Sequence, residues 1–379
     1  MLEASPSEPA AQATIVADAR PARGRASAAS VSASRWLPAV AVSMAYPFAL
    51  HGCVAAVHAA QASAGGVRAL WSLSVLVMVA LTLAPAALSL RALYAIRFDT
   101  GASAVAVRRL MHLGVAVPPF YLLCIRVADL GALVGGTASG LIAWWGVWAV
   151  LGVLVWNTGR AAAPTAAEAA DERAGRLLST PAGRSRRIHR IAVVAVLATF
   201  LVAHLANHLF ALWSIPAQQT AMLALRAWYR AIWIEPVILA LFVIAALAGL
   251  TRLGRLTRSQ GDGFRVLQTA SGCYLVFFLM SHVWATLGAR YQGIDTNWAF
   301  ASGGEAGLLA SDVLAGVLLY YVGSLLAVTV HAGLGLRMVL LSRRVRSAAA
   351  SRSARLVFAS GTALSVLIVA ALLGVRLGG

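Results

Sequence analysis

The chain alternates long apolar runs with short polar segments along most of its length. Several runs approach 20 apolar residues, roughly what an α-helix needs to cross a ~30 Å hydrocarbon core. We predict nine membrane spans, at residues 36–60, 69–90, 107–130, 138–158, 188–213, 234–251, 266–288, 312–336 and 356–375. Two longer polar stretches lie outside them. We interpret residues 1–35 as a disordered cytoplasmic tail and residues 159–186 as a linker.

The pattern repeats inside the chain with an offset of 78 residues. This offset places Arg265 on Arg187 and His282 on His204, so two spans match at their start and in their interior. The spans that follow them align as well. A fixed period defines the building unit of a fold. We therefore predict an all-α polytopic membrane protein, made of four repeated helical hairpins and a closing helix. Its front half (36–158) has four spans, and its rear half (187–379) has five.

Composition supports the membrane assignment. The chain is 60% hydrophobic and 12% charged, a balance that cannot cover the surface of a soluble globular protein. The net charge of +18 would suggest nucleic acid as a partner of a soluble chain, but all 31 basic residues are arginine and 25 of them lie on one side of the predicted spans. This is the positive-inside distribution. It predicts a lipid bilayer and no nucleic acid as partner, with the N-terminus inside and the C-terminus outside.

The residue usage also bears on the source and on covalent chemistry. Arginine without lysine, together with abundant alanine, indicates a GC-rich bacterial genome, so we expect a bacterial inner membrane. Three cysteines, Cys53, Cys124 and Cys273, all fall inside predicted spans. Their positions predict neither a disulfide framework nor a zinc site, and no Cys-x-x-Cys-His motif marks covalent haem attachment.

Two histidines stand at the same depth in the membrane. His204 and His282 each follow the arginine at the start of their span by 17 residues, or roughly 25 Å along a helix. They lie on parallel helices at equivalent repeat positions, which suits two axial ligands of one haem. The alternative is that each ring bonds a backbone carbonyl. For one histidine alone the two interpretations are about equal, and the matching depth favours haem ligation.

The other histidines of the rear half leave alternatives open. His208 lies one turn beyond His204 and is either a rival ligand or, as we favour, a helix cap with Asn207. His331 lies on a helix of opposite direction, and its repeat equivalent near Ala246 is not a histidine. A second haem ligated by His331 would need its partner there, so we expect one haem b per chain and keep a second haem as the less favoured alternative.

Polar residues at the inner boundary form a second candidate group. His189 lies beside Arg187 and Arg190, either as a solvated charge cluster or as a contact for a haem propionate or a quinone carbonyl, since arginine offers a fixed fork of donors. Gln268 and Ser271 lie at matching depth and are candidates for further hydrogen bonds. In the front half, the residue at the repeat position equivalent to His51 is an arginine, so we expect no haem there. We interpret the histidines of the front half as structural.

The motif Arg-x-x-Gln-x-x-Ser-Gly-x-x-Leu-x-x-Phe-x-x-x-His, from Arg265 to His282, resembles the cytochrome b membrane anchors of succinate dehydrogenase and fumarate reductase. His189-Arg190 and the segment from His331 to Arg337 are similar to other parts of those anchors, and the resemblance covers about residues 187–340. It implies haem b, a quinone and separate flavin and iron–sulfur subunits, and it adds Arg265 and His331 to the candidate cofactor-binding residues. The anchors have three to five helices and lack a front half, so a duplicated stand-alone relative fits the length better.

Three functions compete on this basis. The first is a b-type membrane cytochrome that passes electrons between quinone and a partner. The second is a haem-binding membrane protein without turnover, with a sensing, storage or structural role. The third is a haem-free transporter in which the buried histidines and Arg126 line a path, since internal repeats are common in transporters.

Overall fold

The protein is all-helical and polytopic, as the sequence predicts. The computed structural model describes residues 31–133, 140–160, 182–304, 307–311 and 315–377, and no strand occurs in these ranges. Eight helices are long and apolar enough to cross a membrane, and a bent pair raises the number to nine. The helices that make up the predicted spans are α1 (Leu37–Ala62), α2 (Gly65–Ala95), α3 (Ala102–Val115), α4 (Val117–Leu133), α5 (Gly140–Arg160), α7 (Ala182–Val196) with α8 (Val202–Trp213), α10 (Ile234–Leu256), α11 (Gly263–Tyr291), α13 (Leu318–Ser342) and α14 (Ser347–Leu372).

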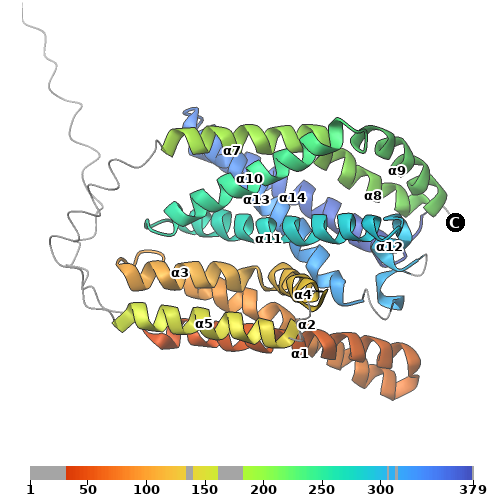
Figure 1. Cartoon of the computed structure of the whole chain (residues 1–379), viewed down its shortest axis with the longest axis horizontal. Helices are drawn as coiled ribbons and strands as arrows, with labels where there is room; N and C mark the ends of the chain where they lie inside the picture. The colour runs from red at the N-terminus through yellow and green to blue at the C-terminus, as the bar shows by residue number, and fades with distance from the viewer. Residues whose placement is uncertain (1–30, 134–139, 161–181, 305–306, 312–314, 378–379) are drawn as a thin grey trace, which may run out of the picture.

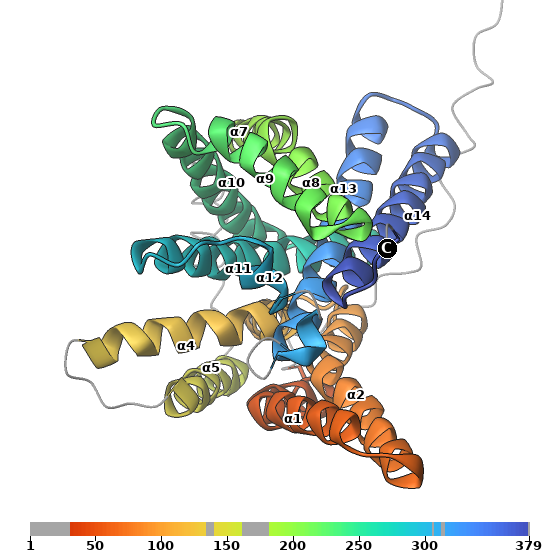
Figure 2. The ribbon, with the colours of Figure 1, turned by 90° about the vertical axis from the view of Figure 1, so that its right-hand side faces the viewer.

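The long helices run roughly along one axis (Figure 1). The turns that precede α3, α11 and α14 lie at one end, with the start of α7, and we call this the basic end because most of the arginines lie there. The opposite end carries α9 (Ile215–Tyr229), the short α12 (Trp298–Ser302) and the C-terminus. Seen along the axis, α1–α2, α4–α5, α7–α10 and α13–α14 radiate as separate spokes, and α11 lies between α10 and α4 (Figure 2). Many leucines and valines on the spokes are exposed, which suits contact with lipid.

The third predicted span differs from the prediction, because it is broken rather than continuous. Helices α3 and α4 meet at 82° around Ala116. Two prolines, Pro118 and Pro119, begin α4. A proline ring clashes with the carbonyl four residues earlier and lacks an N–H, so neither proline lets α3 continue straight through. The bend is fully buried, since Ala116 is 0% exposed.

A buried polar joint connects the two halves at the basic end. The guanidinium of Arg108 donates to the backbone carbonyls of Thr257 (2.7 Å), Ile96 (3.1 Å) and Asp99 (2.8 Å), at the ends of α10 and α2. A cation suits the negative end of a helix dipole. On the same face of α3, His112 contacts the Arg108 carbonyl through Nδ1 at 2.6 Å and the Thr269 hydroxyl through Nε2 at 2.9 Å. This imidazole therefore links the front half to α11 of the rear half.

Candidate functional site

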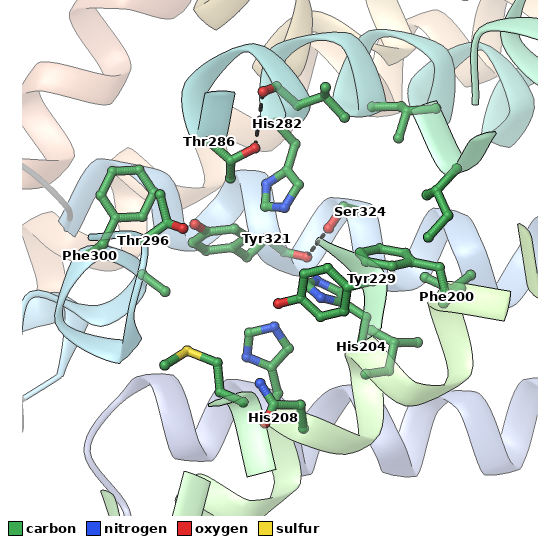
Figure 3. Close-up of a pocket in the computed structure, with 18 of the residues that line it drawn as sticks. Phe200, His204, His208, Tyr229, His282, Thr286, Thr296, Phe300, Tyr321 and Ser324 are labelled. Carbon is green, nitrogen blue, oxygen red and sulfur yellow. Dashed lines mark hydrogen bonds between the residues drawn. The ribbon is translucent and has the colours of Figure 1, made fainter. Parts of the chain in front are cut away.

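A largely apolar cavity of 260 Å³ opens between α8, α9, α10, α11 and α13, toward the end opposite to the basic end. We call it the first cavity. Three imidazoles converge on it: His204 and His208 from α8, and His282 from α11 (Figure 3). The two helices run in the same direction, so the matching depth predicted for His204 and His282 brings their side chains to the same cavity.

The geometry of this pair suits two axial ligands of one metal. The ring centroids of His204 and His282 are 6.2 Å apart, and the ring planes make an angle of 69°. Two metal–nitrogen bonds of about 2 Å, plus about 1 Å from each nitrogen to its ring centre, give a separation of roughly 6 Å. Each ring can turn about its metal–nitrogen bond, so the angle between the planes is compatible with ligation.

Each of the two rings is supported by the residue four positions earlier. Phe200 stacks on His204 with centroids 4.9 Å apart and an 18° angle, and Phe278 stacks on His282 at 5.2 Å and 14°. On a helix, residues four apart are neighbours on one face. The repeat therefore includes the side chain that orients each imidazole.

The nitrogens of His204 and His282 make no hydrogen bond to the residues that the structure describes. This disfavours the alternative that the rings bond backbone carbonyls. Within the described residues no group of three or more His, Cys, Asp or Glu side chains is arranged to hold a metal ion. A pair of histidines without further ligands suits a metal that brings its own equatorial ligands, as the iron of haem does.

His208 is placed differently from our expectation of a helix cap. Helix α8 continues to Trp213, and His208 lines the first cavity with its ring centroid 5.0 Å from that of His204. Its Nδ1 is buried without a hydrogen-bond partner among the described residues, and so are Oδ1 of Asn207, Oε1 of Gln218 and Nε1 of Trp298. All four residues line the first cavity. Buried polar atoms without partners are costly, so this polar chamber calls for a ligand or water that bonds them.

Charged side chains surround the open end of the first cavity. Arg290 forms an ion pair with Glu235, and Arg226 donates to Asp295 at 2.7 Å. Arg230 donates to the Thr296 hydroxyl at 2.8 Å and lines the cavity. Partial burial, with the nearby cations of Arg226 and Arg290, lowers the pKa of Arg230. A carboxylate at this end would relieve the repulsion between these cations.

A second cavity of 220 Å³ lies beside the first, nearer the basic end, as its lining residues near the start of α7 and the end of α10 indicate. Five apolar side chains line both cavities: Leu201, Phe242, Phe278, Leu279 and Val328. His189 of α7 and His331 of α13 both line the second cavity, with ring centroids 6.4 Å apart and ring planes at 89°. The sequence did not predict this pair, because the repeat gives Ala246 as the equivalent of His331.

The remaining candidate residues separate into two groups. Gln268 lines the second cavity, and the Ser271 hydroxyl lies 3.3 Å from Nδ1 of His331. The three arginines lie elsewhere. Arg187, Arg190 and Arg265 are exposed at the basic end, and none of them lines either cavity.

A π-helical turn, η2 (Leu197–Leu201), lies between α7 and α8 and separates His189 from His204. Such turns insert one extra residue into a helix, rotate the positions that follow, and occur often at functional sites. Leu201 at the end of this turn lines both cavities. The turn therefore sets the rotation of His204 about the helix axis relative to His189. No periodic pattern in the sequence reveals this rotation.

No known protein-family model, curated protein or solved structure matches the chain. The resemblance to the cytochrome b anchors stays a prediction.

Proposed function

We propose that this protein is a b-type membrane cytochrome that binds haem in the first cavity and exchanges electrons with a quinone. The observation that carries the proposal is the pair His204 and His282, whose ring centroids are 6.2 Å apart in an apolar cavity and whose nitrogens lack hydrogen bonds to the described residues. Phe200 and Phe278 support the same two rings. When bound there, haem supplies one-electron redox chemistry.

The residues around the pair would do three things. The imidazoles would hold the iron from two helices, and the apolar side chains that line the cavity would keep water from the macrocycle. Arg230 offers a guanidinium to a propionate at the open end, as a charge-assisted hydrogen bond. The polar chamber at His208, Asn207, Gln218 and Trp298 offers both donors and acceptors, which suits a quinone carbonyl or a quinol hydroxyl.

The proposed membrane and the proposed orientation of the chain rest on its composition. The arginine distribution supports a bacterial inner membrane with the basic end and the N-terminus inside. A cysteine introduced as Ser259→Cys would then react with an impermeant maleimide only after the membrane is opened. A dehydrogenase role requires separate flavin and iron–sulfur subunits, whose co-purification with the tagged chain would support that role over a stand-alone cytochrome.

The experiment is a reduced-minus-oxidised optical spectrum of the purified protein with a pyridine haemochrome count, after expression with ample haem. Wild-type protein should carry low-spin haem b, and His282→Ala should lower the content by one haem per chain. His51→Ala is the matched control, since this front-half ring already bonds the Pro47 carbonyl at 2.6 Å. His204→Ala and His208→Ala together identify the ligand from α8.

A haem-free transporter is favoured by one observation, the broken helix pair α3–α4. Broken helices line many transport sites, but here the break is packed closed at Ala116. Wild-type protein without haem, expressed under ample supply, would reject the cytochrome and turn attention to this break.

A further inference from the structure

Trp298 is a buried indole in the wall of the first cavity, at the end opposite to the basic end. Its side chain lines the cavity and is 3% exposed, and its Nε1 has no hydrogen-bond partner among the described residues. An indole N–H only donates, and a buried donor without a partner is costly. A ligand atom that meets this N–H must therefore be an acceptor.

Local hydrogen bonds fix the short helix α12, which carries this indole. Asn297 caps its start, with the side-chain oxygen accepting from the N–H of Phe300 at 3.2 Å. Gly303 follows its end with a positive φ of 73°, which glycine adopts without strain. Ser302 is fully buried, and its hydroxyl lies 2.9 Å from the Trp298 carbonyl. Because both ends of this single turn are fixed, Trp298 keeps its position whether or not a ligand is bound.

Arg376, which follows α14, packs against the same indole. Its Cζ lies 5.7 Å from the centre of the Trp298 ring, within the range of a cation–π contact. Its Nη1 donates to the Ala371 carbonyl at 2.9 Å, and the next residue, Leu377, donates its N–H to the Leu212 carbonyl at the end of α8. These bonds hold the guanidinium beside the ring. A positive charge there disfavours a cationic ligand at the indole N–H.

We propose that Trp298 donates its Nε1–H to a ring oxygen of the quinone in the polar chamber, and that Arg376 is the positioning residue for this indole. The inference rests on the proposed function, because it names the donor for the ligand proposed there. The ring centroid of His208 lies 5.9 Å from that of the indole, so the ligand would also lie beside an imidazole. A cation near the indole draws electron density from the ring, which makes the N–H a stronger donor.

The competing interpretation is that Trp298 only fills space, since its ring belongs to a buried apolar cluster that includes Leu308 and Ile368. Trp144 of the front half shows what a purely structural indole looks like in this protein. It is 0% exposed, and its Nε1 donates to the Ser43 carbonyl at 3.0 Å. The two indoles are equally buried, and they differ in whether the protein itself bonds the N–H. This difference makes Trp144 the matched control.

The test is equilibrium dialysis of radiolabelled decylubiquinone against the full-length protein in detergent, with haem counted on the same samples. Trp298→Phe removes the N–H and should raise the Kd about fivefold, the effect of losing one neutral hydrogen bond. Trp144→Phe should leave the Kd unchanged, although it lowers the thermal midpoint. Both variants should keep the haem content of the wild type, because neither residue is a proposed ligand of the iron.

The role of Arg376 is tested through its charge. Arg376→Met should raise the Kd about two- to fivefold, whereas Arg376→Lys keeps a cation and should restore most of the affinity. Arg68→Met, at an exposed arginine near the start of α2, should have no effect. Size-exclusion elution identifies any variant that fails to fold, and the two Arg376 variants decide if Trp298→Phe is among them.

The outcomes separate this inference from the proposed function. Wild-type affinity in folded Trp298→Phe would overturn the inference, and equal Kd values in Arg376→Met and Arg376→Lys would overturn the positioning role. Haem in a wild-type protein that binds no decylubiquinone would keep the cytochrome and overturn the inference. Binding that depends on Trp298 in a protein without haem would support the inference and reject the cytochrome.

Discussion

Gly272→Ala tests how His331 packs against α11 in the second cavity. The new Cβ would lie 2.9 Å from Cε1 and 3.2 Å from Nδ1 of His331, so the ring must move by about 0.5 Å to reach the 3.4 Å of ordinary contact. Moving the ring lengthens or breaks its bond to the Gln268 carbonyl. Overpacking of this kind costs about 1–3 kcal/mol. The gain in helix propensity from glycine to alanine, about 1 kcal/mol, offsets part of this cost.

Gly288→Ala is the matched control on the same helix. A Cβ at Gly288 meets no atom within 4 Å, so this variant should gain the propensity term alone. The difference between the two variants then isolates the overpacking, at about 1–3 kcal/mol. For a unit the size of the rear half this corresponds to roughly 2–12 °C in the thermal midpoint.

The assay is thermal unfolding of both variants in one detergent, with haem content measured on the same samples. Gly272→Ala should unfold at the lower temperature, whereas both variants should keep the haem proposed for the first cavity. Equal midpoints in the two variants would refute the placement of His331 against α11.

Two other predictions follow from particular contacts. Arg108→Met removes three hydrogen bonds to backbone carbonyls in the polar joint and should destabilise the chain by about 3 kcal/mol or more. Arg109→Met, at the exposed neighbouring residue, should change stability by about 0.5 kcal/mol or less in the same thermal unfolding assay. Equal effects would show that the joint between the halves does not depend on Arg108. Phe200→Leu and Phe278→Leu should each shift the midpoint of the proposed haem in a redox titration, because each phenyl ring stacks on one of the two histidines proposed to ligate it. An unchanged midpoint in both variants would contradict this arrangement.

The positions of elements along the membrane normal are largely readable from the sequence. In lipid every backbone group must bond within the chain, so an apolar run of sufficient length becomes a helix whatever its neighbours are. Helix rise is fixed, and the 17 residues from Arg187 to His204 and from Arg265 to His282 therefore give the two rings equal depth. In the structure both side chains line the first cavity, at the equal depth that the sequence predicts.

Tertiary structure decided which side chains face one another across the membrane plane. Rotation about each helix axis and the choice of neighbour depend on packing, and a repeat offset carries no information about either. The repeat alignment of His331–Arg337 with Ala246–Arg252 pointed from His331 to Ala246, whereas the packing of α7, α10 and α13 brings His189 near His331. The break at Ala116 and the π-turn at Leu197–Leu201 likewise depend on how local strain is accommodated by neighbouring helices. The depth of a side chain in the membrane depends on its own helix alone. The side chain that it contacts on another helix depends on how the whole bundle packs.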